Sequence, residues 1–288
     1  MTTHREQTAR EDTRQHDQQK QMDLVRDRFT RTANVFADFA LTDRAAEAEH
    51  LLRLVAPNGA EHALDVACGP GTLARVFARH VRWIGGLDLT PAMLARARDD
   101  AAANRIGNFL PMRGNALGMP FHDGTFDIVV TSYSIHHLPD PVAAIREIAR
   151  ILKRGGKFGL LDMIASENPA QAKACNDIEI DRDASHTRAL PISEFKSLLK
   201  TCGFAIVACE TEDHPRSFDQ WMHTAGWKRG DAAFEETRKL LEASIPGDTA
   251  GLYAKFLPGP PTHPSASGDP RPDVELHHTA AFIVGQKQ

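Results

Sequence analysis

An acidic residue followed by two glycines forms the first group in this chain whose spacing could bind a ligand. Asp65 lies in the short apolar run 63–67, and Gly69 and Gly71 follow it ahead of a segment with helical apolar spacing. A strand, a glycine turn and a helix direct backbone N–H groups and a helix N-terminus toward a ligand. The turn also fits the dinucleotide pattern G-x-G-x-x-A, which leaves the ligand open. The carboxylate favours a ligand with a cationic ammonium group, because it would repel a pyrophosphate.

A second carboxylate, Asp88, stands 23 residues after Asp65 at the end of another apolar run. This is about the offset at which an acidic side chain meets the ribose hydroxyls of nucleoside cofactors. Thr90 and Pro91 then fit the N-cap and the first position of a helix. We therefore expect Asp88 to accept hydrogen bonds from both ribose hydroxyls.

A histidine and a carboxylate, predicted at the ends of neighbouring strands, could transfer a proton. His136 follows one predicted strand, and Asp162 ends the next one. Neighbouring strands lie about 4.8 Å apart, so the two side chains could hydrogen-bond and orient the imidazole as a general base. The alternative is a structural role of His136 in its loop. His186 is the second candidate base, in the charged segment 181–188, whose side chains could instead pair among themselves.

Alternating strands and helices from about residue 61 to 163 must position these groups. The predicted strands in this part are 63–67, 83–88, 126–132 and 158–162, and a helix spans 141–153 with Asp140 as its N-cap. This alternation predicts an α/β fold with a parallel sheet and right-handed crossovers. Later elements are a helix over 193–201, strands over 204–209 and 280–284, and a helix over 232–243. Ligands bind at the carboxyl ends of such strands, where the groups above fall.

The order of these blocks resembles that of the class I S-adenosylmethionine-dependent methyltransferases. The closest likeness is to the branch of the quinone C-methyltransferases and the small-molecule methyltransferases of secondary metabolism. It is clear over residues 61–163 and weaker over 178–210. One block alone would be a weak signal, whereas five in sequence are strong. After the opening run 65–71, the five blocks are 83–88, 113–121, 126–132, 136–141 and 152–157.

The resemblance implies S-adenosyl-L-methionine as cofactor and a Rossmann-like, seven-stranded, mostly parallel sheet. Its last strand would return antiparallel between strands five and six, and a helical cap would cover the cleft. Asp65 would meet the methionine ammonium directly or hold the glycine turn, and Leu89 and Met93 would flank the adenine. The predicted cofactor-binding residues are Asp65, Ala67, Gly69, Gly71, Asp88, Leu89, Met93, Asn115, Ala116 and Ser132.

Two positions depart from the family pattern. Ala67 stands where many members have the first glycine of the turn, and Asn115 stands where an aspartate is common beside the adenine. An asparagine can still accept a hydrogen bond from the exocyclic amine through its carbonyl oxygen. We expect both variants to be tolerated.

Composition narrows the function classes. The 288 residues carry a formal net charge of −4, which argues against a nucleic-acid-binding surface. No run of about 18 apolar residues and no apolar signal core is present, so we expect a cytoplasmic protein without a membrane span. The four cysteines are too few and too irregular for a disulfide framework, and no metal-binding spacing is recognisable. We expect a small-molecule acceptor, no metal, and a monomer or homodimer.

The predicted organisation has three parts. Residues 1–21 are almost wholly polar and are expected to form a disordered tail or a frayed helix. Residues 22–60 would form N-terminal cap helices, and 61–288 the cofactor-binding domain. Insertions at about 163–192 and 211–275 would enclose an acceptor pocket, with a proline-rich irregular loop over 258–272. The adjacent His277 and His278 are expected at the surface.

The sequence leaves other functions open. A non-methylating relative that keeps the cofactor, such as a cyclase or decarboxylase, and a cofactor-binding regulatory protein share these motifs. A dinucleotide oxidoreductase is the more distant alternative. The acceptor, the atom that would be methylated and the oligomeric state do not follow from the residues.

Overall fold

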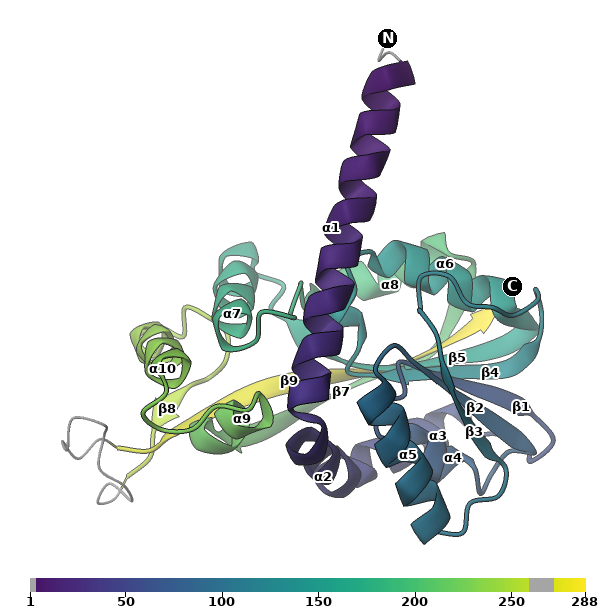
Figure 1. The fold of residues 1–288 in the computed structure, drawn as a ribbon. Coiled ribbons are helices and arrows are strands. Elements are labelled where there is room, and N and C mark those ends of the chain that lie inside the picture. The colour runs from purple at the N-terminus through teal and green to yellow at the C-terminus, as the bar shows by residue number, and fades with distance from the viewer. Residues whose placement is uncertain (1–3, 259–271) are drawn as a thin grey trace.

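A single sheet organises the molecule (Figure 1). The computed structural model describes residues 4–258 and 272–288, with side chains for residue 13 and from residue 15 onward. Seven strands follow the order β3-β2-β1-β4-β5-β9-β7, while β6 pairs with β5 and β8 with β9. The strands are β1 (His62–Val66), β2 (Trp83–Asp88), β3 (Phe109–Arg113), β4 (Phe126–Ser132), β5 (Leu152–Ala165), β6 (Leu190–Pro191), β7 (Phe204–Ser217), β8 (Lys255–Phe256) and β9 (Val274–Lys287).

Strand direction follows the prediction. β1 to β5 pair in parallel along the path, and β9 runs antiparallel between β5 and β7. Asp65 on β1 is level with Gly86 on β2 and Val130 on β4. The carboxyl ends of these strands therefore meet at one edge of the sheet, where the predicted ligand groups stand. The Rossmann-like fold with an antiparallel last strand is confirmed.

Helices cover both faces of the sheet (Figure 1). α6 (Pro141–Ile151) and α8 (Ile192–Thr201) bury Ile145, Ile148 and Phe195 in the core of one face. α3 (Ala45–Val55) and α4 (Thr72–Phe77) bury Leu51 and Phe77 in the core of the other. α5 (Pro91–Ala103) packs beside β3. As expected, the Asp140 side chain caps α6 by accepting the Ala143 N–H at 2.9 Å. Apolar spacing, capping and Pro at the first turn thus give these helices their faces and ends.

A third apolar cluster lies beyond the main sheet. It joins α7 (Pro169–Arg182), α9 (Phe218–Thr224) and α10 (Ala232–Ser244) to the start of β9. Phe218, Trp221 and Phe234 are buried there. The two insertions predicted at 163–192 and 211–275 therefore pack against each other, and we call this unit the insertion cap.

The outer ends of β7 and β9 are longer than predicted. The sequence indicates strands over 204–209 and 280–284, whereas the two strands pair from Phe204–Lys287 to Ser217–Glu275. The β9 extension alternates buried and partly exposed residues, as a half-buried strand should. The β7 extension is polar and largely exposed, so it carries no such pattern. His278 was expected at the surface. It is only 9% exposed, because the paired extensions of β7 and β9 place it under the insertion cap.

The N-terminal segment, expected to form a disordered tail or a frayed helix, is helical. α1 runs from His4 to Arg31, and α2 (Ala33–Asp43) follows it. The Gln21 amide donates to the carbonyl of Ser185 at 2.6 Å and to that of His137 at 3.3 Å. The segment is polar, but Ala, Gln, Glu, Arg and Lys are good helix formers, which favours continuation of the helix. No helix in the described part of the chain has the length and apolarity needed to cross a bilayer. The proline-rich loop predicted over 258–272 lies almost entirely outside the described residues.

Candidate active site

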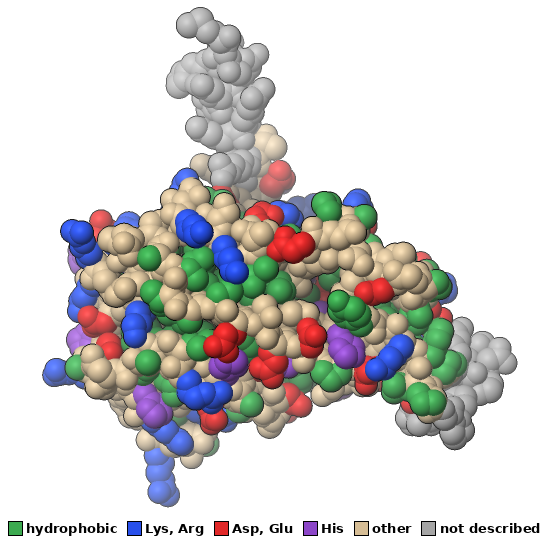
Figure 2. Space-filling view, turned by 180° about the vertical axis from the view of Figure 1, so that it is seen from behind, with side chains coloured by type: hydrophobic (Ala, Val, Ile, Leu, Met, Phe, Trp, Pro, Cys, Tyr) green, Lys and Arg blue, Asp and Glu red, His purple; other side chains and the backbone are tan. Residues whose placement is uncertain are grey.

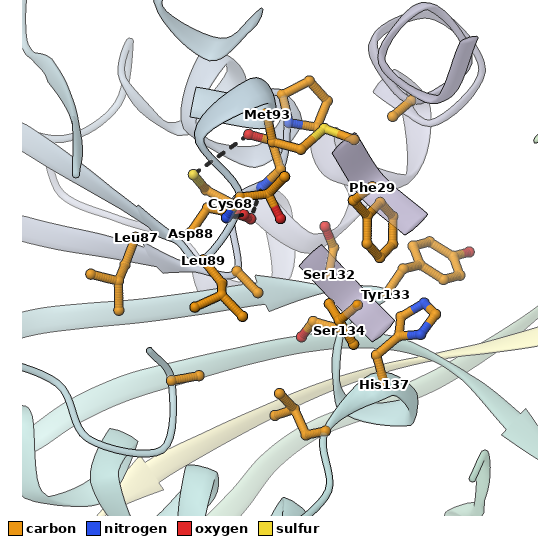
Figure 3. A pocket seen from close by; sticks show the side chains of 18 of the residues that line it. Phe29, Cys68, Leu87, Asp88, Leu89, Met93, Ser132, Tyr133, Ser134 and His137 are labelled. Atoms are coloured by element: carbon orange, nitrogen blue, oxygen red, sulfur yellow. Dashed lines mark hydrogen bonds between the residues drawn. The ribbon is translucent and has the colours of Figure 1, made fainter. Parts of the chain in front are cut away.

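A cleft of about 1040 Å³, open to solvent, lies at the carboxyl ends of β1, β2 and β4. In Figure 3, Asp88 and Leu89 lie on one side of it, and Phe29, Tyr133 and His137 on the other. α1 and α2 also contribute Phe29 and Phe36 to its wall. Eight of the ten predicted cofactor residues line the cleft, and they are Ala67, Gly69, Asp88, Leu89, Met93, Asn115, Ala116 and Ser132.

The glycine turn at its base has a left-handed backbone at alternate residues. Ala67, Gly69 and Gly71 have φ values of 55°, 52° and 88°. Gly71 does not line the cleft but stands at the N-cap of α4. A left-handed residue other than glycine costs roughly 1–2 kcal/mol, which explains why a glycine is common at the position of Ala67. The turn therefore keeps its shape despite that substitution.

Asp65 lies beneath this turn rather than in the cleft wall. Its side chain is 1% exposed, and Oδ2 accepts the N–H of Ala74 in α4 at 3.2 Å. Oδ1 is buried without a hydrogen-bond partner. Burial raises the pKa of this carboxyl well above its usual range. An unpaired buried carboxylate oxygen is costly, so the site gains free energy from any donor or cation that reaches it.

Asp88 connects two loops. Oδ2 accepts the N–H of Gly69 at 2.8 Å, and Oδ1 accepts the N–H of Thr90 at 2.7 Å. Burial raises the pKa of this carboxyl, and hydrogen bonds from the N–H groups of Thr90, Gly69 and Leu89 and from the Thr90 hydroxyl oppose that rise. Asp88 thus holds the turn and also lines the cleft.

The Asn115 amide is already engaged. Its Oδ1 accepts the N–H of Leu117 at 3.0 Å, and its Nδ2 lies 3.1 Å from the sulfur of Met22 on α1. The carbonyl oxygen expected to face an adenine amine therefore shares its lone pairs with its own loop. Contact with Met22 shows that α1 closes this side of the cleft.

His136 and Asp162 meet as the strand order predicted. His136 Nδ1 lies 2.5 Å from Asp162 Oδ1, and both side chains are buried. Asp162 also accepts the N–H groups of Ser134, Ile135 and Met163. These donors hold the carboxylate in place and favour a proton on Nδ1, which leaves Nε2 as the acceptor.

A second cavity, of about 580 Å³, adjoins the cleft. Four residues line both spaces: Phe36, Arg44, Tyr133 and His137. His136 and His186 line the second cavity and not the cleft. Their rings are 5.4 Å apart, and His186 Nε2 lies 2.7 Å from Asn176 Oδ1. Burial lowers the pKa of His186 to about 4.

Residues 64–160 match the family described as "Methyltransferase domain". The chain is similar to the uncharacterized methyltransferase YcgJ of Bacillus subtilis, with 28% identity over 74% of this chain and 82% of the relative. The crystal structure of that protein superimposes with a TM-score of 0.74 at 25% identity, covering 84% of this chain and 97% of that chain.

Two relatives have named acceptors. A ubiquinone/menaquinone biosynthesis C-methyltransferase of Roseobacter denitrificans is 33% identical over 44% of this chain and 52% of its own length. The 27-O-demethylrifamycin SV methyltransferase of Amycolatopsis mediterranei is 25% identical over 76% of this chain and 78% of its own. The chain belongs to the class I S-adenosylmethionine-dependent methyltransferases. It is an enzyme that acts on a small molecule, with S-adenosylmethionine as its cofactor.

The cleft of this methyltransferase fits that cofactor. Asp65 keeps an unpaired oxygen beside the glycine turn, as a ligand with an ammonium group would require. The Asp88 carboxylate lines the cleft where ribose hydroxyls would bind, and Leu89 and Met93 supply apolar surface for an adenine. In the described part of the chain, no three His, Cys, Asp or Glu side chains converge as a metal site would require.

Several residues around the second cavity escaped the sequence analysis. Tyr133 has a left-handed backbone (φ 49°), and the Arg44 guanidinium lies 3.5 Å from the centroid of its ring. The position of Tyr133 directly after β4 was a usable signal. Arg28 forms a buried ion pair of 2.8 Å with Asp183. Arg44 and Arg216 gave no sequence signal. Arg44 lies between α2 and α3 and Arg216 on the extension of β7, so only the folding of distant segments brings them together.

Proposed function

We propose that this methyltransferase methylates a hydroxyl or amino group of a small ring metabolite held in the second cavity. His136 is the general base and Asp162 orients it, while His186 is the second candidate base. The observation that carries this proposal is His136, which is paired with Asp162 and lines a cavity that adjoins the cleft. The relative that methylates a rifamycin oxygen supports an oxygen acceptor.

The cofactor contacts belong to the same proposal. Asp88 accepts hydrogen bonds from the ribose hydroxyls, and Asp65 attracts the ammonium group through Oδ1. Leu89, Met93 and Ala116 pack against the adenine. Asn115 holds the Gly114–Leu117 loop that approaches the adenine edge, and Gly69 and Ser132 supply backbone and hydroxyl groups to the methionine part.

The two cavities divide the chemical work. When bound, S-adenosylmethionine supplies an electrophilic methyl group on a sulfonium. Phe36 and Tyr133 stand at the junction of the cavities, where they exclude water and align the acceptor. His136 takes the acceptor proton at Nε2, and Asp162 stabilises the resulting imidazolium. α1 to α3 cover the cleft, and the insertion cap encloses the acceptor.

Replacement of His136 by Ala tests the chemical role. We expect kcat for S-adenosylhomocysteine formation, measured with a panel of phenols and aromatic amines, to fall by about 10²–10⁴. The Kd for S-adenosylmethionine should stay the same, because the imidazole faces the other cavity. His122→Ala, at an exposed site, is the control. A kcat within about fivefold of wild type, with a lower Tm, would assign His136 a structural role.

The cellular location, the substrate class and the oligomeric state of the enzyme are also part of the proposal. All four cysteines are free thiols, which supports a cytoplasmic location. On the face shown in Figure 2, acidic and basic side chains are interspersed without a broad basic surface. With the net charge of −4, this supports free small molecules over nucleic acid as substrates. The enzyme acts as a monomer or homodimer, which light scattering after size exclusion would check.

A further inference from the structure

The second cavity has an imbalance of charge. Four arginines and two carboxylates line it: Arg28, Arg44, Arg182, Arg216, Glu179 and Asp183. Each carboxylate is paired with one arginine, because Arg28 lies 2.8 Å from Asp183 and Arg182 lies 3.2 Å from Glu179. Arg182 also donates to the Trp221 carbonyl and the Thr224 hydroxyl. Arg28 and Arg182 therefore each have a carboxylate partner.

Arg44 and Arg216 have no such partner. Neither side chain forms an ion pair or a hydrogen bond with any described residue, and the Nε atom of each is buried without a partner. Two carboxylates attract Arg44 through space, Glu47 and Asp162. Glu47 lies 3.4 Å from His214 and keeps Oε2 without a hydrogen-bond partner, and the oxygens of Asp162 accept from His136 and backbone N–H groups. Neither carboxylate forms an ion pair with Arg44 or Arg216 in the described part of the chain.

Aromatic rings hold the two guanidinium groups in one place. The guanidinium carbons of Arg44 and Arg216 each lie 5.1 Å from the centroid of the Phe39 ring. Arg44 also stacks on Tyr133. A guanidinium that stacks through its face keeps its N–H donors in the plane, where they can bind a planar or tetrahedral oxyanion. Their mutual repulsion, which lowers the pKa of Arg44 in addition to its burial, makes an anion between them favourable.

We propose that the acceptor of this enzyme carries an oxyanion group, a carboxylate or a phosphate, which Arg44 and Arg216 bind inside the second cavity. This inference rests on the proposed function, because it takes that cavity as the acceptor site. The anion would anchor one end of the acceptor on the two arginines and direct its hydroxyl or amino group toward His136. The substrate class is thus a small aromatic or cyclic acid, and a neutral ring would bind weakly.

Calorimetric titration of the enzyme saturated with S-adenosylhomocysteine tests this inference. The probes are benzoate, phenyl phosphate and the neutral benzamide. We expect the better of the two anions to bind at least about tenfold more tightly than benzamide, the equivalent of one charge-assisted hydrogen bond. Which anion binds better distinguishes a carboxylate from a phosphate. Equal binding of all three, or no binding of either anion up to its solubility limit, would overturn the inference.

Arginine variants locate the anion. Arg216→Gln should abolish the preference for the anion, and Arg216→Lys should restore part of it. Arg44→Gln should weaken it in the same direction. Arg98→Gln is the control, because it makes the same charge change at an exposed site of α5 and should leave the preference for the anion intact. An unaltered preference in Arg216→Gln would contradict the assignment. Tm values identify any variant that is unfolded.

The cofactor titration separates the two proposals. The Arg216 and Arg98 variants should bind S-adenosylhomocysteine with the wild-type Kd, because neither side chain lines the cleft. Wild-type enzyme that binds S-adenosylhomocysteine but does not discriminate between benzoate and benzamide contradicts the anion site alone. His136→Ala enzyme with undiminished kcat contradicts the proposed chemistry, whatever the anion titrations show.

Discussion

At the scale of single residues, Asp88 combines two roles that the sequence presents as one. Its carboxylate faces the cleft, and it also accepts the N–H groups of Gly69 and Thr90. Asp88→Ala should therefore weaken S-adenosylhomocysteine binding by about 2–3 kcal/mol through lost charge-assisted hydrogen bonds. It should also lower Tm, because the part-buried N–H of Gly69 and the buried N–H of Thr90 lose their acceptor. Asp99→Ala on the exposed face of α5 is the control, and unchanged affinity by calorimetry would remove Asp88 from the site.

His186 gives the fold a dependence on pH. Burial lowers its pKa to about 4, against about 6.5 in an unfolded chain. The unfolded state binds more protons between these values, so stability is full above pH 6.5 and is lost as the pH falls toward 4. From pH 7 to pH 5 we expect the free energy of unfolding in urea to decrease by about 2 kcal/mol from this residue. His186→Gln should remove that part of the decrease while the exposed His122→Gln retains it, and identical slopes would contradict the assignment.

At the scale of elements, α1 forms part of the cleft wall. Met22, Val25 and Phe29 line the cleft, and Gln21 ties the helix to the loop of His137. Removal of residues 1–29 should weaken S-adenosylhomocysteine binding at least about tenfold, because apolar surface at the cleft returns to water. Removal of residues 1–18 takes away mostly polar side chains and should change the Kd less than about twofold. Equal effects of the two truncations would show that α1 does not close the cleft.

At the scale of the whole molecule, the insertion cap has its own core beside the cofactor domain. Phe234 is 2% exposed in that cluster, far along the chain from every cleft residue. Phe234→Ala should cost about 3–5 kcal/mol of stability and raise the KM for the acceptor, with little change in the Kd for S-adenosylhomocysteine. Phe77→Ala, in the core under the cleft, is the matched comparison and should affect both. A Phe234 variant that loses cofactor affinity first would show that the two cores fold as one unit.

The sequence indicated the cofactor side of the enzyme in detail. Asp65, the glycine turn and Asp88 belong to three short neighbouring stretches, so strand and turn patterns sufficed to locate them. The His136–Asp162 pair also followed, because parallel strands adjacent in order bring their ends together. The sequence did not indicate that Asp65 and Gly71 lie outside the cleft wall, because burial beneath a turn depends on how α4 packs.

The acceptor side was decided by the tertiary structure. Arg44 follows α2, Arg216 lies on a polar strand extension without alternation, and Tyr133 follows β4, and no local pattern relates the three. His278 is polar and flanked by polar residues, yet the pairing of β9 with β7 places it against Glu179. Local hydrogen bonding and apolar periodicity specify strands, turns and their ends, so the sequence by itself determined the fold and the cofactor cleft. Long-range packing of the helices and of the β7–β9 pair specifies which charged side chains remain unpaired. Only the folded chain could therefore show the unpaired arginines of the second cavity.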